Sequence, residues 1–385
     1  MLLPFFMHKP DYSNCIVNLM GSVLRGQARL KNSVKLPAPL KQLPPSEFKE
    51  KNTLVMIIDG LGYDFLKRHA RGSFMVRHLK SKITSVFPST TASAITSFFT
   101  GEVPAEHGST GWFIWLKELG CVVKILPFEA RCSDIPLSFD GLYPYDFIRG
   151  KSVFDKVNVK CCIVNRKHII DSDSSIKFFG EHAKFPYTNL NGFFRQMKTA
   201  LKGDEKKLVM SYWPEFDTLA HKKGINHRDT INHFWELDSR LEKLSKSVKN
   251  TKIIITADHG VIDSSKKKII HLKKHPKLNS MLRIPLCGEP RLVYCYVKSG
   301  MEKAFEDYTS KLDWCDCFLS KNLVDKNFFG KGKNPHFLDR IGDYCLIMKE
   351  NYALVDNIAG EEIHKLVGFH GGASSQEMYV PLIIV

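Results

Sequence analysis

Acidic and imidazole side chains recur directly after apolar runs of this chain or in glycine-flanked turns. The set is Asp59, Asp217, His221, Asp258, His259 and His370. A carboxylate at the end of a buried strand is costly unless it is paired or binds a metal ion. Carboxylate oxygens and imidazole nitrogens together suit Zn²⁺ or Mn²⁺. Six such ligands make two sites of three, each with an open position, which is the catalytic arrangement of a metal site.

The recurrence of these side chains is what favours a metal site. A single aspartate of this kind more often caps a helix or forms a salt bridge. Three aspartates and three histidines in comparable positions make that interpretation much weaker. The spacing of Asp217 and His221 is helical, so one helical turn presents both side chains to the same ion.

A hydroxyl-rich stretch, SVFPSTTASAITSFFTG at 85–101, offers a nucleophile. Its plain interpretation is a buried helix that is capped by Ser89-Thr90-Thr91. A hydroxyl at a helix start also gains from the helix dipole, which favours an anion there. A pair of adjacent cations can hold a phosphoryl group for in-line displacement. A hydroxyl with no base beside it needs a metal ion to lower its pKa. Thr91 is therefore a candidate to take a covalent phosphoryl group.

Alternating strands and helices must position these side chains. Continuous apolar runs predict strands at 53–58, 160–164, 207–212, 253–256 and 380–385. One helical pattern begins at about residue 64, and another spans residues 227–248. This alternation predicts an α/β sandwich, with helices on both sides of a mainly parallel central sheet. Ligands of such sheets bind beyond the carboxyl ends of the strands, where the acidic residues lie.

The domain organisation follows from the segments that fit this alternation less well. Residues 32–52 are rich in proline and lysine and are interpreted as an exposed lead-in. We therefore expect an N-terminal helix and lead-in at 1–52 and a single catalytic domain at 53–385. Insertions at about 113–150 and 263–345 are expected to form cap segments over the carboxyl edge of the sheet.

Composition narrows the class of protein. The chain has 385 residues, 43% of them hydrophobic, a net charge of +16 and ten cysteines. It is globular in composition, and the irregular cysteine spacing does not make a zinc framework. Without a signal-peptide pattern or an 18-residue apolar segment, we expect a cytoplasmic protein with no membrane association, either a monomer or a homodimer. Met7 is an alternative start.

The positive charge indicates an anionic substrate or partner. The lysines at 266–268 and 273–274 form the densest run, and a solvated face is their plain interpretation. No RNP signature, zinc finger or basic heptad array accompanies them. A small phosphate ester is thus the expected partner, and nucleic acid is not.

The ordered motifs resemble the alkaline phosphatase superfamily, and within it the type I phosphodiesterase/nucleotide pyrophosphatase branch. The resemblance covers roughly 50–112, 205–262 and 365–385 and implies two divalent cations, Zn²⁺ or alternatively Mn²⁺. One cation would be held by Asp59, Thr91, Asp258 and His259, and the other by Asp217, His221 and His370. Thr91 matches the nucleophile of the family because it lies nine residues before Thr100 of a Thr-Gly pair. Thr90 is the second choice, ahead of Ser89 and Ser93.

One departure concerns the turn His107–Trp112. Diesterases of the family often carry an asparagine there that holds a phosphate oxygen, and here Trp112 falls at that place. Either another donor replaces the asparagine or Trp112 lines a substrate slot, so Trp112 and Thr90 are predicted substrate contacts. The arginine clamp of strict monoesterases has no obvious counterpart, and the C/S-x-P-x-R pattern of sulfatases is absent.

The predicted function is hydrolysis of phosphodiester or pyrophosphate bonds in small phosphorylated molecules or nucleotides. The reaction is expected to use two cations and a covalent phosphothreonine intermediate at Thr91. One alternative is a phosphomonoesterase or phosphonate hydrolase that uses the same ligands. A second is a nucleic-acid-binding protein that retains the fold without turnover.

Overall fold

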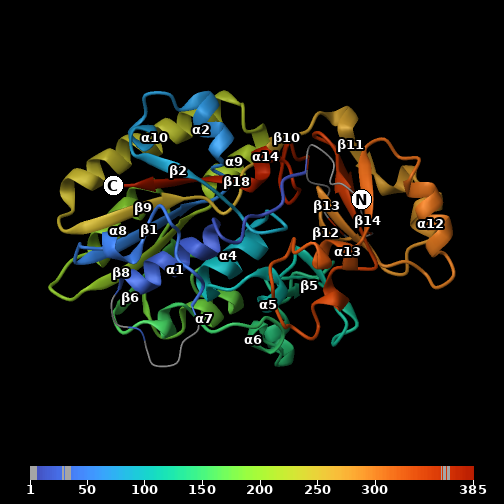
Figure 1. The fold of residues 1–385 in the computed structure, drawn as a ribbon, viewed down its shortest axis with the longest axis horizontal. Helices are drawn as coiled ribbons and strands as arrows, with labels where there is room; N and C mark the ends of the chain where they lie inside the picture. The colour runs from blue at the N-terminus through green and yellow to red at the C-terminus, as the bar shows by residue number, and fades with distance from the viewer. Residues whose placement is uncertain (1–6, 28–29, 31–35, 357, 359–360, 362–364) are drawn as a thin grey trace.

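The computed structural model describes residues 7–27, 30, 36–356, 358, 361 and 365–385. Within them, two seven-stranded sheets dominate the architecture. The sheet with helices on both sides lies on the left of Figure 1, and the second sheet lies on the right. Two small two-stranded ladders accompany them.

The first sheet is mainly parallel. Its order is β2-β18-β9-β1-β8-β6-β7. The bounds are β1 Asn52–Ile58, β2 Leu79–Thr84, β6 Lys160–Arg166, β7 Ala183–Tyr187, β8 Lys207–Trp213, β9 Thr251–Thr256 and β18 Tyr379–Ile384. The strands from β9 to β7 run parallel, and β18 is antiparallel to both of its neighbours. The predicted α/β sandwich is confirmed.

Helices cover both faces of this sheet. In Figure 1, α2, α9 and α10 lie above it, and α1, α4 and α7 lie below it. The helices of this part are α1 Ile16–Gly26, α2 Tyr63–His69, α3 Phe74–Arg77, α4 Thr91–Thr100, α5 Pro104–His107, α6 Pro144–Phe147, α7 Asp173–Phe179, α8 Leu190–Ala200, α9 Glu215–Lys223, α10 Arg228–Ser247 and α14 Ser375–Met378. On α10, within the helical pattern predicted at 227–248, four apolar residues at helical spacing are buried: Phe234, Leu237, Leu241 and Leu244. Coverage of both faces explains why every residue of β1 is buried.

The second sheet is antiparallel, with the order β14-β15-β13-β12-β3-β4-β5. Its strands are β3 Phe113–Leu116, β4 Cys121–Lys124, β5 Glu129–Ala130, β12 Cys287–Glu289, β13 Leu292–Cys295, β14 Cys315–Leu319 and β15 Tyr344–Met348. Both predicted insertions contribute strands to it. They meet where β12 pairs with β3, at Gly288 and Phe113.

Shorter elements complete this part. The helices are α11 Pro276–Ser280, α12 Glu302–Thr309 and α13 Ser320–Asp325. The small ladders pair β10 Ile262–Asp263 with β17 Gly368–Phe369, and β11 Ile269–His271 with β16 Ala353–Val355. The 3₁₀ helices are η1 Pro45–Glu47, η2 Leu137–Asp140, η3 Phe154–Lys156, η4 Lys266–Lys268, η5 Leu272–Lys274 and η6 Leu338–Arg340.

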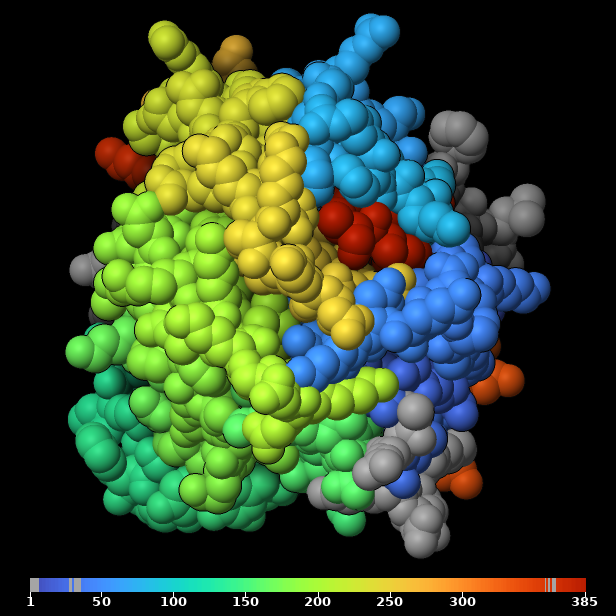
Figure 2. Space-filling view, turned by 90° about the vertical axis from the view of Figure 1, so that its left-hand side faces the viewer, coloured from blue at the N-terminus to red at the C-terminus, as the bar shows by residue number. Residues whose placement is uncertain are grey.

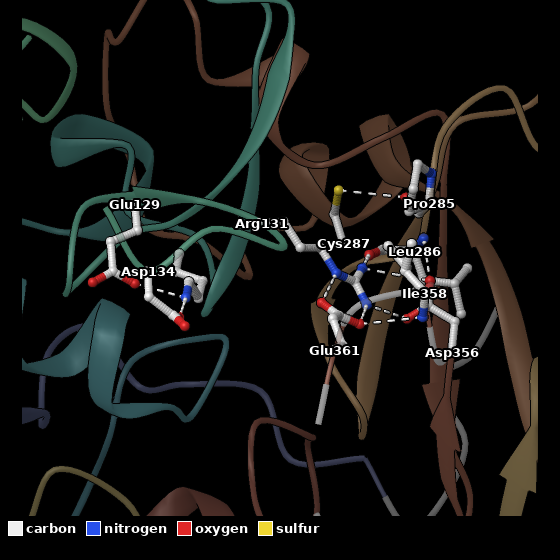
Figure 3. A network of polar contacts seen from close by, with 10 residues as sticks. Glu129, Arg131, Asp134, Pro285, Leu286, Cys287, Asp356, Ile358 and Glu361 are labelled. Atoms are coloured by element: carbon white, nitrogen blue, oxygen red, sulfur yellow. Dashed lines mark hydrogen bonds and ion pairs between the residues drawn. The ribbon is translucent and has the colours of Figure 1, made fainter. Parts of the chain in front are cut away.

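A buried arginine ties the two insertions to the chain that follows them. Arg131, just after β5, lies between two carboxylates in Figure 3. Its guanidinium donates to Asp356 and Glu361, each at 2.6 Å, and to the carbonyl of Leu286 at 2.7 Å. It also lies 4.1 Å from the ring centroid of Phe113. Charge-assisted contacts of this kind, away from water, fix segments that share no regular pairing.

The lead-in differs from the prediction. Leu40 and Leu43 are completely buried rather than exposed, and the Leu40 N–H donates to the hydroxyl of Ser22 on α1 at 2.8 Å. The proline-rich segment therefore packs its leucines into the core of the first sheet. Residues 32–35 of the predicted lead-in lie outside the described residues.

Figure 2 shows the end of the molecule where the parallel strands begin. Segments around residues 50, 200 and 250 lie side by side there, and the last residues of the chain emerge between neighbouring segments. The carboxyl ends of the strands therefore point the other way, toward the second sheet. Among the described residues, every helix is too short or too polar to cross a bilayer.

Candidate active site

Three aspartates meet at the carboxyl ends of β1, β8 and β9. Asp59 directly follows β1, Asp258 lies two residues after β9, and Asp217 lies in the first turn of α9, after β8. The turn at Gly60 has φ +73°, and a Cβ there would lie 2.9 Å from Oδ1 of Asp217. Glycine therefore allows the chain to turn tightly against a second acidic residue. The Gly60 N–H also donates to Oδ1 of Asp258 at 3.1 Å.

The first cluster consists of Asp59, Asp258 and His259, all buried. One potential ligand atom from each lies within 4.8 Å of the other two. The Nε2 atom of His259 is 3.3 Å from Oδ1 of Asp59 and 3.4 Å from Oδ2 of Asp258. The hydroxyl oxygen of Thr91 is 3.0 Å from the same Nε2. Four potential ligand atoms thus converge on one point.

Hydrogen bonds behind this cluster orient its members. Nδ1 of His259 lies 3.1 Å from the carbonyl of Gly260, which only accepts, so Nδ1 carries the proton and Nε2 is free to bind a metal ion. The hydroxyl of Tyr212 donates to Oδ2 of Asp59. The backbone N–H of His259 donates to Oδ1 of Asp258 at 3.0 Å. Such outer contacts are typical of metal ligands.

The second cluster consists of Asp217, His221 and His370. Nε2 of His221 is 3.0 Å from Oδ2 of Asp217 and 3.1 Å from Nε2 of His370. Nδ1 of His221 donates to the carbonyl of Gly368 at 2.7 Å. The predicted helical spacing is observed, because α9 carries both Asp217 and His221. The imidazole rings of His259 and His370 stack at 3.8 Å between centroids, so the two clusters are adjacent.

The residues present fit a pair of divalent cations. Within the two clusters, four buried side-chain atoms have no hydrogen-bond partner among the described residues: Asp59 Oδ1, Asp217 Oδ1, Asp258 Oδ2 and His370 Nδ1. Buried polar atoms without partners are rare, and each calls for an explanation. Carboxylate oxygens and imidazole nitrogens in two adjacent groups match the donor preferences of Zn²⁺ and Mn²⁺.

The charges of the three buried aspartates also favour bound cations. Burial raises the pKa of Asp59 well above its usual value, and the charges of Asp258 and Asp217 add to this. Burial also raises the pKa of Asp258. For Asp217, burial acts upward, but the charge and hydrogen bond of His221 outweigh it and lower the pKa. Three carboxylates in one water-poor region repel one another, and bound cations remove that cost.

Among the candidate hydroxyls, that of Thr91 is the one that faces the first cluster. Thr91 is the first residue of α4, where backbone N–H groups have no acceptor within the helix. The hydroxyl of Thr90 donates instead to Oε1 of Glu289 at 2.6 Å, so it does not cap the helix. The hydroxyls of Ser89 and Ser93 donate to backbone carbonyl groups elsewhere.

Glu289 is a site residue that sequence reasoning missed. Trp112, the predicted substrate contact, is half-buried, and its backbone N–H donates to Oε1 of Glu289 at 2.7 Å. Burial raises the pKa of Glu289 to about 7. Nothing in the local sequence CGEPR marks this residue, because its place depends on the pairing of β12 with β3.

Comparisons with solved structures agree with the fold of this chain. Murine ectonucleotide pyrophosphatase/phosphodiesterase 5 superimposes with a TM-score of 0.62 at 17% identity, over 86% of this chain and 87% of that one. The human form gives 0.64 at 15% identity, with the same coverage. Phosphonoacetate hydrolase from Sinorhizobium meliloti gives 0.65 at 16% identity, over 86% and 89%. Among curated protein sequences, none matches the chain.

Fold and site together define a phosphohydrolase of the alkaline phosphatase superfamily. The sequence model described as "Type I phosphodiesterase / nucleotide pyrophosphatase" matches residues 53–373. The chain belongs to this family of metal-dependent hydrolases. The predicted family and enzyme class are therefore confirmed.

Proposed function

We propose that this protein hydrolyses phosphodiester or pyrophosphate bonds of small phosphorylated molecules or nucleotides, through a covalent phosphothreonine at Thr91. The observation that carries the proposal is the convergence of the Thr91 hydroxyl with Asp59, Asp258 and His259, next to a second ligand cluster. An inactive variant of the murine neighbour, in which alanine replaces a threonine, is known in complex with AMP. That neighbour supports a nucleotide as one substrate class.

The residues that would hold the cations are Asp59, Thr91, Asp258 and His259 for one, and Asp217, His221 and His370 for the other. When bound, two divalent cations lower the pKa of an attacking oxygen and neutralise charge on the phosphoryl and leaving oxygens. We propose Zn²⁺, with Mn²⁺ as the alternative, from the mixed carboxylate and imidazole donors.

In the first step, Oγ1 of Thr91 forms a bond to phosphorus as its proton is lost to solvent. The bond from phosphorus to the leaving oxygen breaks, and that oxygen takes up a proton. In the second step, a water oxygen bonds to phosphorus, the bond from phosphorus to Oγ1 breaks, and Thr91 regains a proton. The start of α4 favours the anionic group at this place, because its first backbone N–H groups are free to donate.

Thr91→Ala in the zinc-loaded protein tests the proposal. We expect loss of at least a thousandfold in turnover of bis-p-nitrophenyl phosphate, with the fold retained, because the nucleophile is removed. Thr90→Ala is the comparison variant that tests which threonine is the nucleophile, since the Thr90 hydroxyl faces Glu289 instead. Full activity of Thr91→Ala together with loss in Thr90→Ala would assign the nucleophile to Thr90.

A phosphonate substrate is the second candidate. The neighbour from Sinorhizobium meliloti is named a phosphonoacetate hydrolase and was solved with phosphonoacetate. Phosphate release from phosphonoacetate, compared with turnover of bis-p-nitrophenyl phosphate and p-nitrophenyl phosphate, separates phosphonate, diester and monoester chemistry. A preference of at least tenfold for the monoester would reverse the choice of a diester. Salt-sensitive nucleic-acid binding that survives both EDTA and Thr91→Ala would favour the non-catalytic alternative.

For the setting of the protein, we propose a cytoplasmic monomer or homodimer. Buried cysteines such as Cys15, Cys295 and Cys345 form no disulfide, which fits a reducing compartment. We further propose that residues 1–52 are a lead-in and that 53–385 form one catalytic domain with insertions at about 113–150 and 263–345. The shared second sheet supports this division, because both insertions supply its strands.

A further inference from the structure

Glu289 reaches the candidate active site from the second sheet. It is the last residue of β12, and its Oε1 accepts from the Thr90 hydroxyl at 2.6 Å and from the Trp112 N–H at 2.7 Å. Its side chain also lies against Gly371, where a Cβ would come 2.6 Å from the Cβ of Glu289. Three segments that carry site residues therefore surround this carboxylate: the start of α4, the turn at Trp112 and the loop after His370.

Among the described residues, protein donors reach only one of the two carboxylate oxygens of Glu289. Both hydrogen bonds go to Oε1, and within the described part of the chain Oε2 has no hydrogen-bond donor. Glu289 also interacts electrostatically with His221 and Asp217 of the second cluster. A negative charge therefore lies next to the residue that precedes Thr91, on the side of the site formed by the second sheet.

The partners of Glu289 are themselves informative. The Trp112 N–H lies in the turn between α5 and β3. In this chain that N–H is already bonded to Glu289. A phosphoryl oxygen that approaches this side meets a carboxylate rather than a free amide donor. An ionised carboxylate repels additional negative charge, and more strongly in a water-poor site than in bulk water.

We propose that Glu289 is a specificity-determining residue that disfavours substrates with two negative charges on phosphorus and so favours phosphodiesters over phosphomonoesters. The inference rests on the proposed function. It assigns the choice of ester class to the second sheet, whereas the groups proposed to act on phosphorus come from α4 and from the strand ends of the first sheet.

Glu289→Gln tests this inference in the zinc-loaded full chain. Glutamine keeps an oxygen that accepts from Thr90 and Trp112 but removes the charge. We expect the ratio of kcat/KM for bis-p-nitrophenyl phosphate to kcat/KM for p-nitrophenyl phosphate, measured at pH 8, to fall at least tenfold. Most of the change should come from faster monoester turnover, which loss of a purely structural contact would not produce.

Two variants complete the experiment. Glu289→Asp retains the charge, so its ratio should stay nearer to that of the wild type than to that of Glu289→Gln. Glu302→Gln, on exposed α12, is the control and should leave the ratio unchanged. A ratio in Glu289→Gln within twofold of the wild type overturns this inference alone. A wild type that hydrolyses neither ester overturns the proposed function, and this inference with it.

Discussion

The hydroxyl of Tyr212 offers a test of the first cluster that does not depend on knowing the substrate. Tyr212 lies in β8, is buried, and donates to Oδ2 of Asp59. Tyr212→Phe removes this donor with almost no change in volume. A hydrogen bond to a charged acceptor contributes about 1.5–3 kcal/mol. Since about 1.4 kcal/mol corresponds to tenfold, this predicts a loss of roughly 10- to 150-fold in cation affinity if Asp59 is a ligand.

The assay is competition for Zn²⁺ between the full chain and a chromophoric chelator. Tyr294→Phe is the matched control, because Tyr294 is also completely buried and its hydroxyl donates to the carbonyl of Thr110 at 2.9 Å. Both variants should lose some thermal stability, but only Tyr212→Phe should lose affinity for Zn²⁺. Affinity of Tyr212→Phe within threefold of the wild type, or an equal loss in both variants, would refute the role given to Asp59.

Two further predictions concern stability. In a solution with free Zn²⁺ at about 100 times its Kd, removing the ion with EDTA should lower the free energy of unfolding by about 2.7 kcal/mol. An unchanged thermal midpoint would contradict a metal site. Glu377→Gln removes the charge that pairs with buried Arg291 at 2.8 Å. It should lower the free energy of unfolding by about 3–5 kcal/mol at pH 7, measured by urea titration. The control variant Glu302→Gln should not. Burial raises the pKa of Glu377, but Arg291 outweighs it and lowers the pKa below 4.5. The stabilisation by the Glu377–Arg291 pair is therefore fully present above about pH 4.5 and is lost as the pH falls further. A difference in unfolding free energy between variant and wild type that stays constant in acid would contradict it.

The interior of the first sheet could be predicted from the sequence because its strands are continuous apolar runs. Every residue of β1 and β8 is buried. The edge strands gave no such signal. In β2 the first four residues are only partly buried or exposed, and β7 contains Pro186, which an edge strand tolerates because one side of its ladder is unpaired. The prediction used continuous apolar runs, so it missed strands in which more exposed and less exposed residues alternate.

The candidate ligands were predictable for a related reason. Asp59 and Asp258 follow buried strands almost at once, so the sheet itself brings their carboxylates together. His370 follows β17, a two-residue strand outside the first sheet, and the neighbouring Gly371 N–H donates to the carbonyl of Ser89 at 2.9 Å. The composition of the lead-in, rich in proline and lysine, does not reveal that its leucines at 40 and 43 pack into the core.

Glu289 lay beyond sequence reasoning because three separate segments define its surroundings. The backbones of Gly111 and Gly288 approach so closely that a Cβ on Gly111 would lie 2.8 Å from the Cα of Gly288. This approach brings the Trp112 N–H to the Glu289 carboxylate. Both insertions are thus needed to form that side of the site, whereas the metal-ligand candidates come from elements of the first sheet and the loop after β17. We therefore expect variation within the second sheet to change which esters are accepted, while the groups proposed to act on phosphorus stay in place.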